Sequence, residues 1–168
     1  MLGTKIIGSS HPRGVREECT IVGTPKPGTV MEMDYNVSPV GGVYSWQAYG
    51  TTAASGGQGV SADGDRKIIA ILLEKKHEGG IYSDAYADGD RGYLYYPIMG
   101  ERFNMLVANI SGTGDSFSVG DEMMVEDGTG KLLICDSDAE AHPFTMQESS
   151  SALTADAWKH VIFNGSAG

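Results

Sequence analysis

The sequence predicts an all-β fold of antiparallel strands, with an extended N-terminal arm and little helix. Glycine supplies 24 of the 168 residues, and glycine tolerates the positive φ angles that tight β-turns require. The apolar runs are short, and they either alternate with period two or are rich in β-branched residues, as strands are. The length suits one domain with an added arm. We therefore expect an arm over residues 1–24 and one β domain over residues 25–168.

The predicted arm shows neither helical nor strand periodicity, because glycines and prolines interrupt it repeatedly. It holds three basic and two acidic residues, a net charge of +1, whereas the whole chain carries −10 and the remainder therefore −11. This difference is consistent with an arm that docks on an acidic surface of a partner. The candidate docking residues are Lys5, Ile6, Ile7, His11, Arg13 and Arg16.

The first strand is expected over residues 29–35, where Met31 and Met33 face one way and Glu32 and Asp34 face the other. The turn at Pro27-Gly28 delivers the chain into this strand.

A continuous apolar run at residues 68–73 predicts a strand, within 67–74, that is covered on both faces. Pro97 cannot donate to a ladder, so its strand is expected at an edge or with a bulge. Residues 127–130 are typical of a hairpin loop, and residues 154–158 are the one short helix candidate. The remaining predicted strands cover residues 93–99, 103–110, 122–126, 131–135 and 159–163.

A Gly/Ser-rich stretch with three aromatic residues separates the first two strands, at about residues 38–64. It is too long for a tight turn, and long excursions of this kind are often contact surfaces. The aromatic residues are candidates for a partner contact, but they could equally fasten the loop to the domain's own core. They are Tyr44, Trp46 and Tyr49.

The five letters ADGDR occur at residues 62–66 and again at 87–91, and VGD at 119–121 is a looser copy. The flanking sequences do not match, so we attribute the repetition to shared turn chemistry rather than to duplication. In such turns glycine adopts the left-handed conformation and aspartate accepts hydrogen bonds from neighbouring amides.

The amino-acid composition limits which classes of partner and which cellular compartment are expected. A chain with a charge of −10 lacks the surplus of basic residues that binds phosphate backbones, so nucleic acid is not an expected partner. Cys19 and Cys135 lie far apart in the sequence and are expected to be free thiols in a reducing compartment. The N-terminus has no secretory apolar segment of roughly 7–15 residues, and no run approaches the ~20 residues of a membrane span. We expect the chain in the cytoplasm or in a particle assembled there.

Metal and phosphate motifs fail at their defining positions. The acidic run 136–140 opens like a calcium-binding loop, but Ala141 stands where the loop needs glycine and Gln147 where it needs glutamate. Residues 128–131 resemble the end of a phosphate-binding loop, but Leu132 replaces the required Ser or Thr. The four histidines share no metal-ligand spacing, and no serine-nucleophile motif is present. We expect no metal, no cofactor and no catalytic residues.

Several short stretches follow one another in an order typical of one family. They read PGTVMEMD at 27–34, IIAILLE at 68–74, DAYADGDR at 84–91, GERFNMLV at 100–107 and VGDE at 119–122, with MQE at 146–148 and TADAW at 154–158 before a last strand. In this order, which covers roughly residues 25–165, the chain resembles the decoration proteins of bacteriophage capsids, also called cement or head-stabilising proteins.

The resemblance implies a β-barrel-like or β-tulip domain that forms homotrimers on the outer surface of the capsid. Such proteins bind neighbouring subunits of the major capsid protein and stabilise the shell, and they have no catalytic residues. The chain would then be a structural virion protein made in the host cytoplasm, and the arm would dock on the major capsid protein. The stretch 38–64 is an addition relative to compact family members.

Two alternatives come from other functional classes. The first is a receptor- or glycan-binding β domain of a phage fibre or appendage, in which Tyr44, Trp46 and Tyr49 would stack on sugar rings. The second is an enzyme built on a β-barrel, whose catalytic residues come together only in three dimensions.

Overall fold

The computed structural model describes residues 6, 14–34, 39–50, 70–75, 83–109, 116–135 and 143–165. Within these residues the chain forms ten β-strands and no helix. The all-β prediction is therefore confirmed for the part of the chain that the structure describes.

The first five strands close into a barrel in the order β1-β3-β2-β4-β5. β1 pairs antiparallel with β5 over six residue pairs, from Val15 opposite Tyr96 to Thr20 opposite Arg91, and it runs parallel to β3. The strands are β1 (Val15–Ile21), β2 (Val30–Met33), β3 (Ser45–Ala48), β4 (Ala70–Leu72) and β5 (Arg91–Tyr96).

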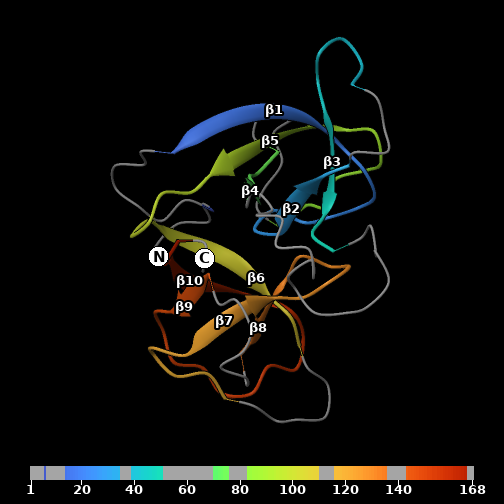
Figure 1. Ribbon diagram of the computed structural model, residues 1–168. Helices are drawn as coiled ribbons and strands as arrows, with labels where there is room; N and C mark the ends of the chain where they lie inside the picture. The colour runs from blue at the N-terminus through green and yellow to red at the C-terminus, as the bar shows by residue number, and fades with distance from the viewer. Residues whose placement is uncertain are drawn as a thin grey trace.

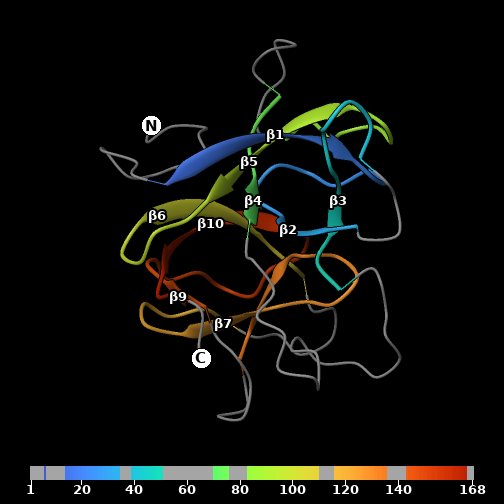
Figure 2. The same ribbon diagram turned by 45° about the horizontal axis from the view of Figure 1, so that its top comes forward.

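The last five strands close into a second barrel in the order β6-β8-β7-β9-β10. This order repeats the first barrel strand for strand, and in each barrel the first strand is parallel to the third while every other pair is antiparallel. In Figure 1 the first barrel lies above the second, and Figure 2 keeps this order in a turned view. The strands are β6 (Arg102–Val107), β7 (Glu122–Val125), β8 (Leu132–Ile134), β9 (Phe144–Met146) and β10 (Ala157–Phe163).

Several sequence expectations are wrong in detail. β1 lies inside the predicted arm. It was not predicted as a strand, because only Cys19 and Ile21 of its seven residues are both apolar and buried. The predicted antiparallel barrel contains a parallel pair in each half. The helix expected over 154–158 is absent, since β10 begins at Ala157. Pro97 follows the end of β5 rather than interrupting it, so β5 keeps partners on both sides.

Four tight turns of one kind deliver the chain into β2, β5, β6 and β7. Each has glycine with positive φ at its third position: Gly28, Gly89, Gly100 and Gly120, with φ between 82° and 98°. In three of them the carboxylate of the fourth residue accepts the backbone N–H of the first, at 2.7 to 2.9 Å. The predicted turn chemistry is confirmed for residues 87–90, and the copy at 62–66 lies outside the described residues.

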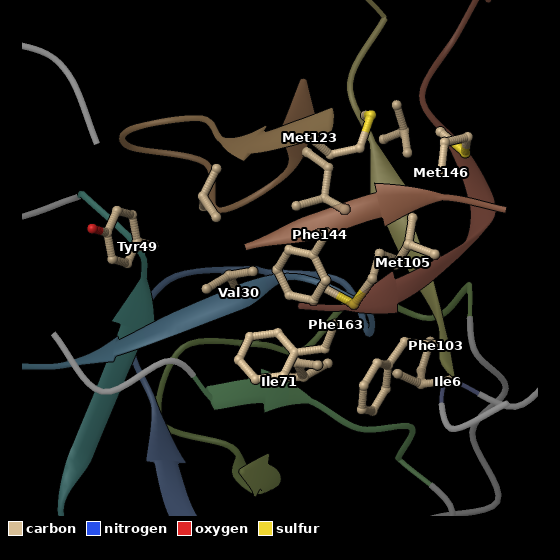
Figure 3. Packing of buried hydrophobic residues seen from close by; sticks show 14 of the residues in the cluster. Ile6, Val30, Tyr49, Ile71, Phe103, Met105, Met123, Phe144, Met146 and Phe163 are labelled. Carbon is tan, nitrogen blue, oxygen red and sulfur yellow. The ribbon is translucent and has the colours of Figure 1, made fainter. Parts of the chain in front are cut away.

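The apolar side chains form two cores. One lies within the first barrel and contains Cys19, Ile21, Met31, Trp46, Ala70, Leu72, Tyr86 and Leu94. The larger one joins the buried residues of the second barrel to the outer face of the first. Figure 3 shows Val30 and Ile71 of the first barrel pointing toward Phe144 and Phe163 of the second. Strand β4 contributes to both cores, as the apolar run predicted, because Ala70 and Leu72 face one and Ile71 the other.

Backbone hydrogen bonds cross the seam between the barrels. The Leu106 N–H donates to the Gly28 carbonyl at 3.0 Å, and the Val30 N–H donates to the Gly130 carbonyl at 2.8 Å. The indole N–H of Trp158 donates to the Pro27 carbonyl at 2.9 Å. Because each bond satisfies a backbone group near the apolar seam, separating the barrels would leave these groups unpaired as well as exposing the shared core.

Asp156 lies at the start of β10 and links three segments. It accepts the backbone N–H of Asn109 at 2.9 Å and forms an ion pair with Lys131 at 2.8 Å. Burial alone would raise the pKa of Asp156, but the hydrogen bonds from Lys131 and Asn109 and the charges of Lys131 and Lys26 outweigh it. Together they hold this pKa below its ordinary value of 3.8.

We expect Asp156→Asn to lower the free energy of unfolding at neutral pH by less than about 1 kcal/mol, because the ion pair is partly exposed. A carboxylate with a lowered pKa adds stability above its unfolded-state pKa, and this contribution disappears as the pH falls through the folded-state value. Urea unfolding should therefore show a difference in the free energy of unfolding between wild type and Asp156→Asn at neutral pH, and this difference should disappear below pH 3.8. A difference that persists in acid would show that the ion pair is not its cause.

Candidate binding surfaces

The predicted docking residues differ in their exposure to solvent. Ile6 is fully buried in the larger core, its N–H donates to the Glu74 carboxylate at 2.7 Å, and its carbonyl accepts the Asn104 N–H at 2.7 Å. The prediction that Ile6 contacts a partner is wrong, because its side chain fills the protein's own core. Arg16 is exposed near the start of β1. The other four, Lys5, Ile7, His11 and Arg13, lie outside the described residues.

The three aromatic residues of the stretch 38–64 also differ in their exposure to solvent. Trp46 and Tyr49 are 1% and 6% exposed, whereas Tyr44 is 42% exposed. Trp46 belongs to the core of the first barrel and meets the Tyr96 ring edge to face at 6.0 Å between centroids. Tyr49 belongs to the larger core. Of the two interpretations left open, packing on the domain's own core is correct for these two rings. A sugar-stacking platform of all three is therefore excluded.

Exposed apolar side chains gather where β1 begins and β5 ends. Val15 lies opposite Tyr96 in the ladder, and Ile98 and Met99 occupy the turn that follows β5. Val15 and Met99 are each 66% exposed and Ile98 is 42% exposed. The exposed Arg16 lies at the same end of the β1–β5 ladder, although its side chain and that of Val15 point to opposite faces of the sheet. We call this end of the ladder the basic corner. Larger exposed apolar groupings of this kind are typical of interaction surfaces.

Arg16 gives the basic corner its charge. Its side chain makes no hydrogen bond or ion pair with any residue that the structure describes, although its charge acts on the nearby Tyr95 hydroxyl and opposes the rise in that group's pKa. Further along the same sheet, Arg91 differs, because its guanidinium lies 2.7 Å from the Glu18 carboxylate. The positive charge of Arg16 is therefore available to a partner.

A buried polar network holds the basic corner in place. The Tyr95 hydroxyl donates to the carboxylate of Glu101 at 2.8 Å and accepts the N–H of Gly14 at 2.6 Å. Glu101 is 2% exposed and also accepts the Ile98 N–H at 2.9 Å. Burial, followed by the hydrogen bond to Glu101, raises the pKa of Tyr95, so the hydroxyl keeps its proton. The network joins the start of β1 to the β5–β6 turn and orders the surface above it.

A second exposed group lies on the other barrel, in the turn before β7. Val119 is 64% exposed and is followed by the carboxylates of Asp121 and the exposed Glu122. We call these three residues the acidic turn. The tip of the β2–β3 hairpin carries a further exposed apolar residue, Val40, at 79%.

The described residues offer little chemistry. Cys19 and Cys135 are free, as predicted. Burial, together with the charges of Glu17 and Glu18, raises the pKa of Cys19 to about 12, so its thiol is not a nucleophile at neutral pH. His160 lies 3.3 Å from the carboxylate of Glu148. Among the described residues, no group of three or more histidine, cysteine, aspartate and glutamate side chains is placed to hold a metal ion.

No protein-family model matches the chain, and no curated protein matches its sequence. Within the described residues there is also no helix that is long and apolar enough to span a membrane.

Sequence analysis did not find the basic corner or the acidic turn. A weak signal exists, because the apolar residues Met99 and Val119 directly precede the turn glycines Gly100 and Gly120, and Ile98 precedes Met99. Turn positions are usually polar, so large apolar residues there indicate exposed contact positions. Nothing in the sequence brings Val15 opposite Tyr96, near the β5–β6 turn, since that arrangement depends on the pairing of β1 with β5.

Proposed function

We propose that this chain is a bacteriophage capsid decoration protein, which binds the outer surface of the major capsid shell and stabilises it. Its partners are the major capsid protein and further copies of itself, most simply as a homotrimer. Its place is the virion surface after synthesis in the host cytoplasm. The proposed role is structural and involves no catalysis and no nucleic acid.

The observation that carries the proposal is the likeness of the strand-and-turn pattern to that family. Most of the stretches that carry the likeness contain part of a strand or the tight turn before one. The turns before β2, β5, β6 and β7 begin strands in both barrels. The motif at 68–74 contains the doubly buried β4, and the motif at 154–158 leads into β10. The likeness therefore concerns features that determine the fold rather than incidental composition.

The architecture of the two barrels also supports the proposal. In the described part of the chain, two closed barrels share an apolar core, and closed barrels leave no free sheet edges for unspecific pairing. A body of this kind bound across the joint between capsid subunits loses its binding free energy when the joint opens. By linkage, it must then stabilise the closed shell.

Particles stripped of this protein should release packaged nucleic acid at a lower temperature than decorated particles, and adding the purified protein should restore the resistance. The readout is dye-detected nucleic-acid release on heating, alongside co-sedimentation of the protein with expanded capsids. If stripped and decorated particles release nucleic acid at the same temperature while host attachment falls, the protein is an appendage and not a cement protein.

A further inference from the structure

One asparagine of the chain is followed by glycine, and this pair is chemically labile. The backbone nitrogen of the following residue can attack the side-chain amide carbon of an asparagine, and glycine has no β-carbon to hinder the approach. The four asparagines of the sequence are followed by Val37, Met105, Ile110 and Gly165. The sequence therefore selects Asn164 as the asparagine most exposed to this reaction.

Aspartate–glycine pairs can close the same ring with loss of water, but the fold protects the two that the structure describes. The Gly89 N–H donates to the Ile21 carbonyl at 2.8 Å, and the Gly128 N–H donates to the Tyr49 carbonyl at 2.9 Å. A nitrogen held in this way cannot turn toward the side chain of the preceding residue without losing its hydrogen bond. The three pairs occupy residues 63–64, 88–89 and 127–128, and the first lies outside the described residues.

The pair that Asn164 forms with Gly165 differs in this respect. The Gly165 N–H makes no hydrogen bond with any residue that the structure describes. Asn164 directly follows β10 and is exposed to solvent. Its backbone N–H donates to the Pro143 carbonyl at 2.8 Å, and its side-chain Nδ2 donates to the Thr145 hydroxyl oxygen at 2.6 Å. The attacked amide is therefore held at the surface, within reach of water, while the attacking nitrogen is free.

We propose that Asn164 deamidates spontaneously in the folded protein. The Gly165 nitrogen loses its proton to solvent and bonds to Cγ of Asn164, and the bond from Cγ to Nδ2 breaks with release of ammonia. Water then opens the resulting cyclic imide at either of its two carbonyls, which gives aspartate or isoaspartate. The chain loses one ammonia and gains one water, so the reaction needs no oxidant, cofactor or enzyme. This inference is independent of the proposed function.

The fold tolerates the product. The new carboxylate can accept a hydrogen bond from the Thr145 hydroxyl in place of the bond that the amide donated. The ladder between β10 and β9 ends at Phe163, so the extra backbone carbon of an isoaspartate falls beyond the last strand pair. The added negative charge lies near Met99, because a β-carbon on Gly165 would be 3.1 Å from the Met99 methyl carbon. Deamidation therefore changes the charge beside an exposed apolar side chain of the basic corner.

Mass spectrometry of the purified full chain, incubated at physiological temperature, tests the reaction. The folded protein should gain one mass unit, and peptide mapping should place aspartate and isoaspartate at residue 164 while Asn104 and Asn109 stay intact. The rate should rise with pH, because the attacking nitrogen must lose its proton. Asn164→Gln is the matched control: attack on the longer side chain closes a larger ring, and the gain in mass should slow by about tenfold or more.

Unfolding separates the role of the fold from that of the sequence. In urea, Asp88 and Asp127 should also form isoaspartate, because the hydrogen bonds of Gly89 and Gly128 are lost, whereas neither should do so in the folded chain. The proposal is wrong if the folded protein keeps its mass while the unfolded chain gains it, or if Asn164→Gln gains mass as fast as wild type. Isoaspartate at Asp88 or Asp127 in the folded protein, formed as fast as at residue 164, would equally contradict it.

Discussion

Deleting residues 1–24 should unfold the first barrel rather than remove a dispensable arm. The deletion removes β1, which pairs with β5 over six residue pairs and runs parallel to β3. It also removes the fully buried side chains of Ile6, Cys19 and Ile21. A closed five-stranded barrel that loses one strand exposes two unpaired strand edges and the apolar interior. We expect an insoluble product, or a protein without a cooperative unfolding transition.

Deletion of residues 1–5 is the control, because it keeps Ile6 and all of β1. This variant should keep most of the wild-type stability when unfolding in urea is followed by tryptophan fluorescence. Trp46 in the first barrel and Trp158 in the second make the measurement sensitive to both. If the protein lacking residues 1–24 unfolds at the wild-type urea midpoint, β1 is not needed and the original arm hypothesis should return.

The error about the arm shows what the sequence can and cannot predict. Strands with strong local patterns, such as the apolar run containing β4 and the alternating residues of β2, were predicted near their observed positions. β1 is mostly polar, β3 lies in a glycine-rich region and β9 is only three residues long, so all three were missed, and their pairing partners are distant in sequence. Tertiary pairing rather than local propensity determines such strands.

The repeated barrel escaped prediction for a related reason. The matching five-letter segments were attributed to shared turn chemistry rather than to duplication, and the copy at 87–91, which lies among the described residues, does form a turn before β5. The repetition that the structure shows is one of strand order, and the amino-acid sequences of the two halves show almost no matching repeat. Strands with different residues can occupy equivalent positions as long as inward positions stay apolar.

Gly130→Ala should destabilise the protein by about 4 kcal/mol or more, through a severe clash and backbone strain. Gly130 has φ of +65°, and a β-carbon there would lie 2.1 Å from the carbonyl oxygen of Val30. The Val30 N–H donates to the carbonyl of Gly130 at 2.8 Å, so relief of the clash would break a hydrogen bond across the barrel seam. Chemical denaturation, or failure to obtain folded protein, is the readout.

Gly128→Ala provides a closely matched control in the same hairpin. Gly128 also has positive φ, at +79°, but nothing lies within 4 Å of the position that a β-carbon would occupy. Its substitution should cost only the conformational strain, about 1 kcal/mol. Equal losses for the two variants would mean that strain alone, and not close approach of the barrels, requires glycine at residue 130.

The candidate surfaces were less predictable than the fold. Arg16 was selected from the charge of the N-terminal segment, and it is exposed as expected. Trp46 and Tyr49 were selected because aromatic residues in a glycine-rich stretch suggest contact, yet both are buried. Composition cannot distinguish an aromatic residue that binds a partner from one that fills a barrel, because the same apolar area drives both.

The seam between the barrels also determines when the chain can finish folding. Trp158 and Pro27, whose hydrogen bond crosses the seam, are 131 residues apart. During synthesis the first barrel can close once β5 has emerged from the ribosome. Its outer apolar face, however, remains exposed to solvent until β6 to β10 have been synthesised and pack against it. Contacts between residues so distant in sequence form slowly, and exposed apolar surface on an incomplete chain favours aggregation. Slower translation past β5 should therefore lengthen the period in which a nascent chain needs chaperone protection.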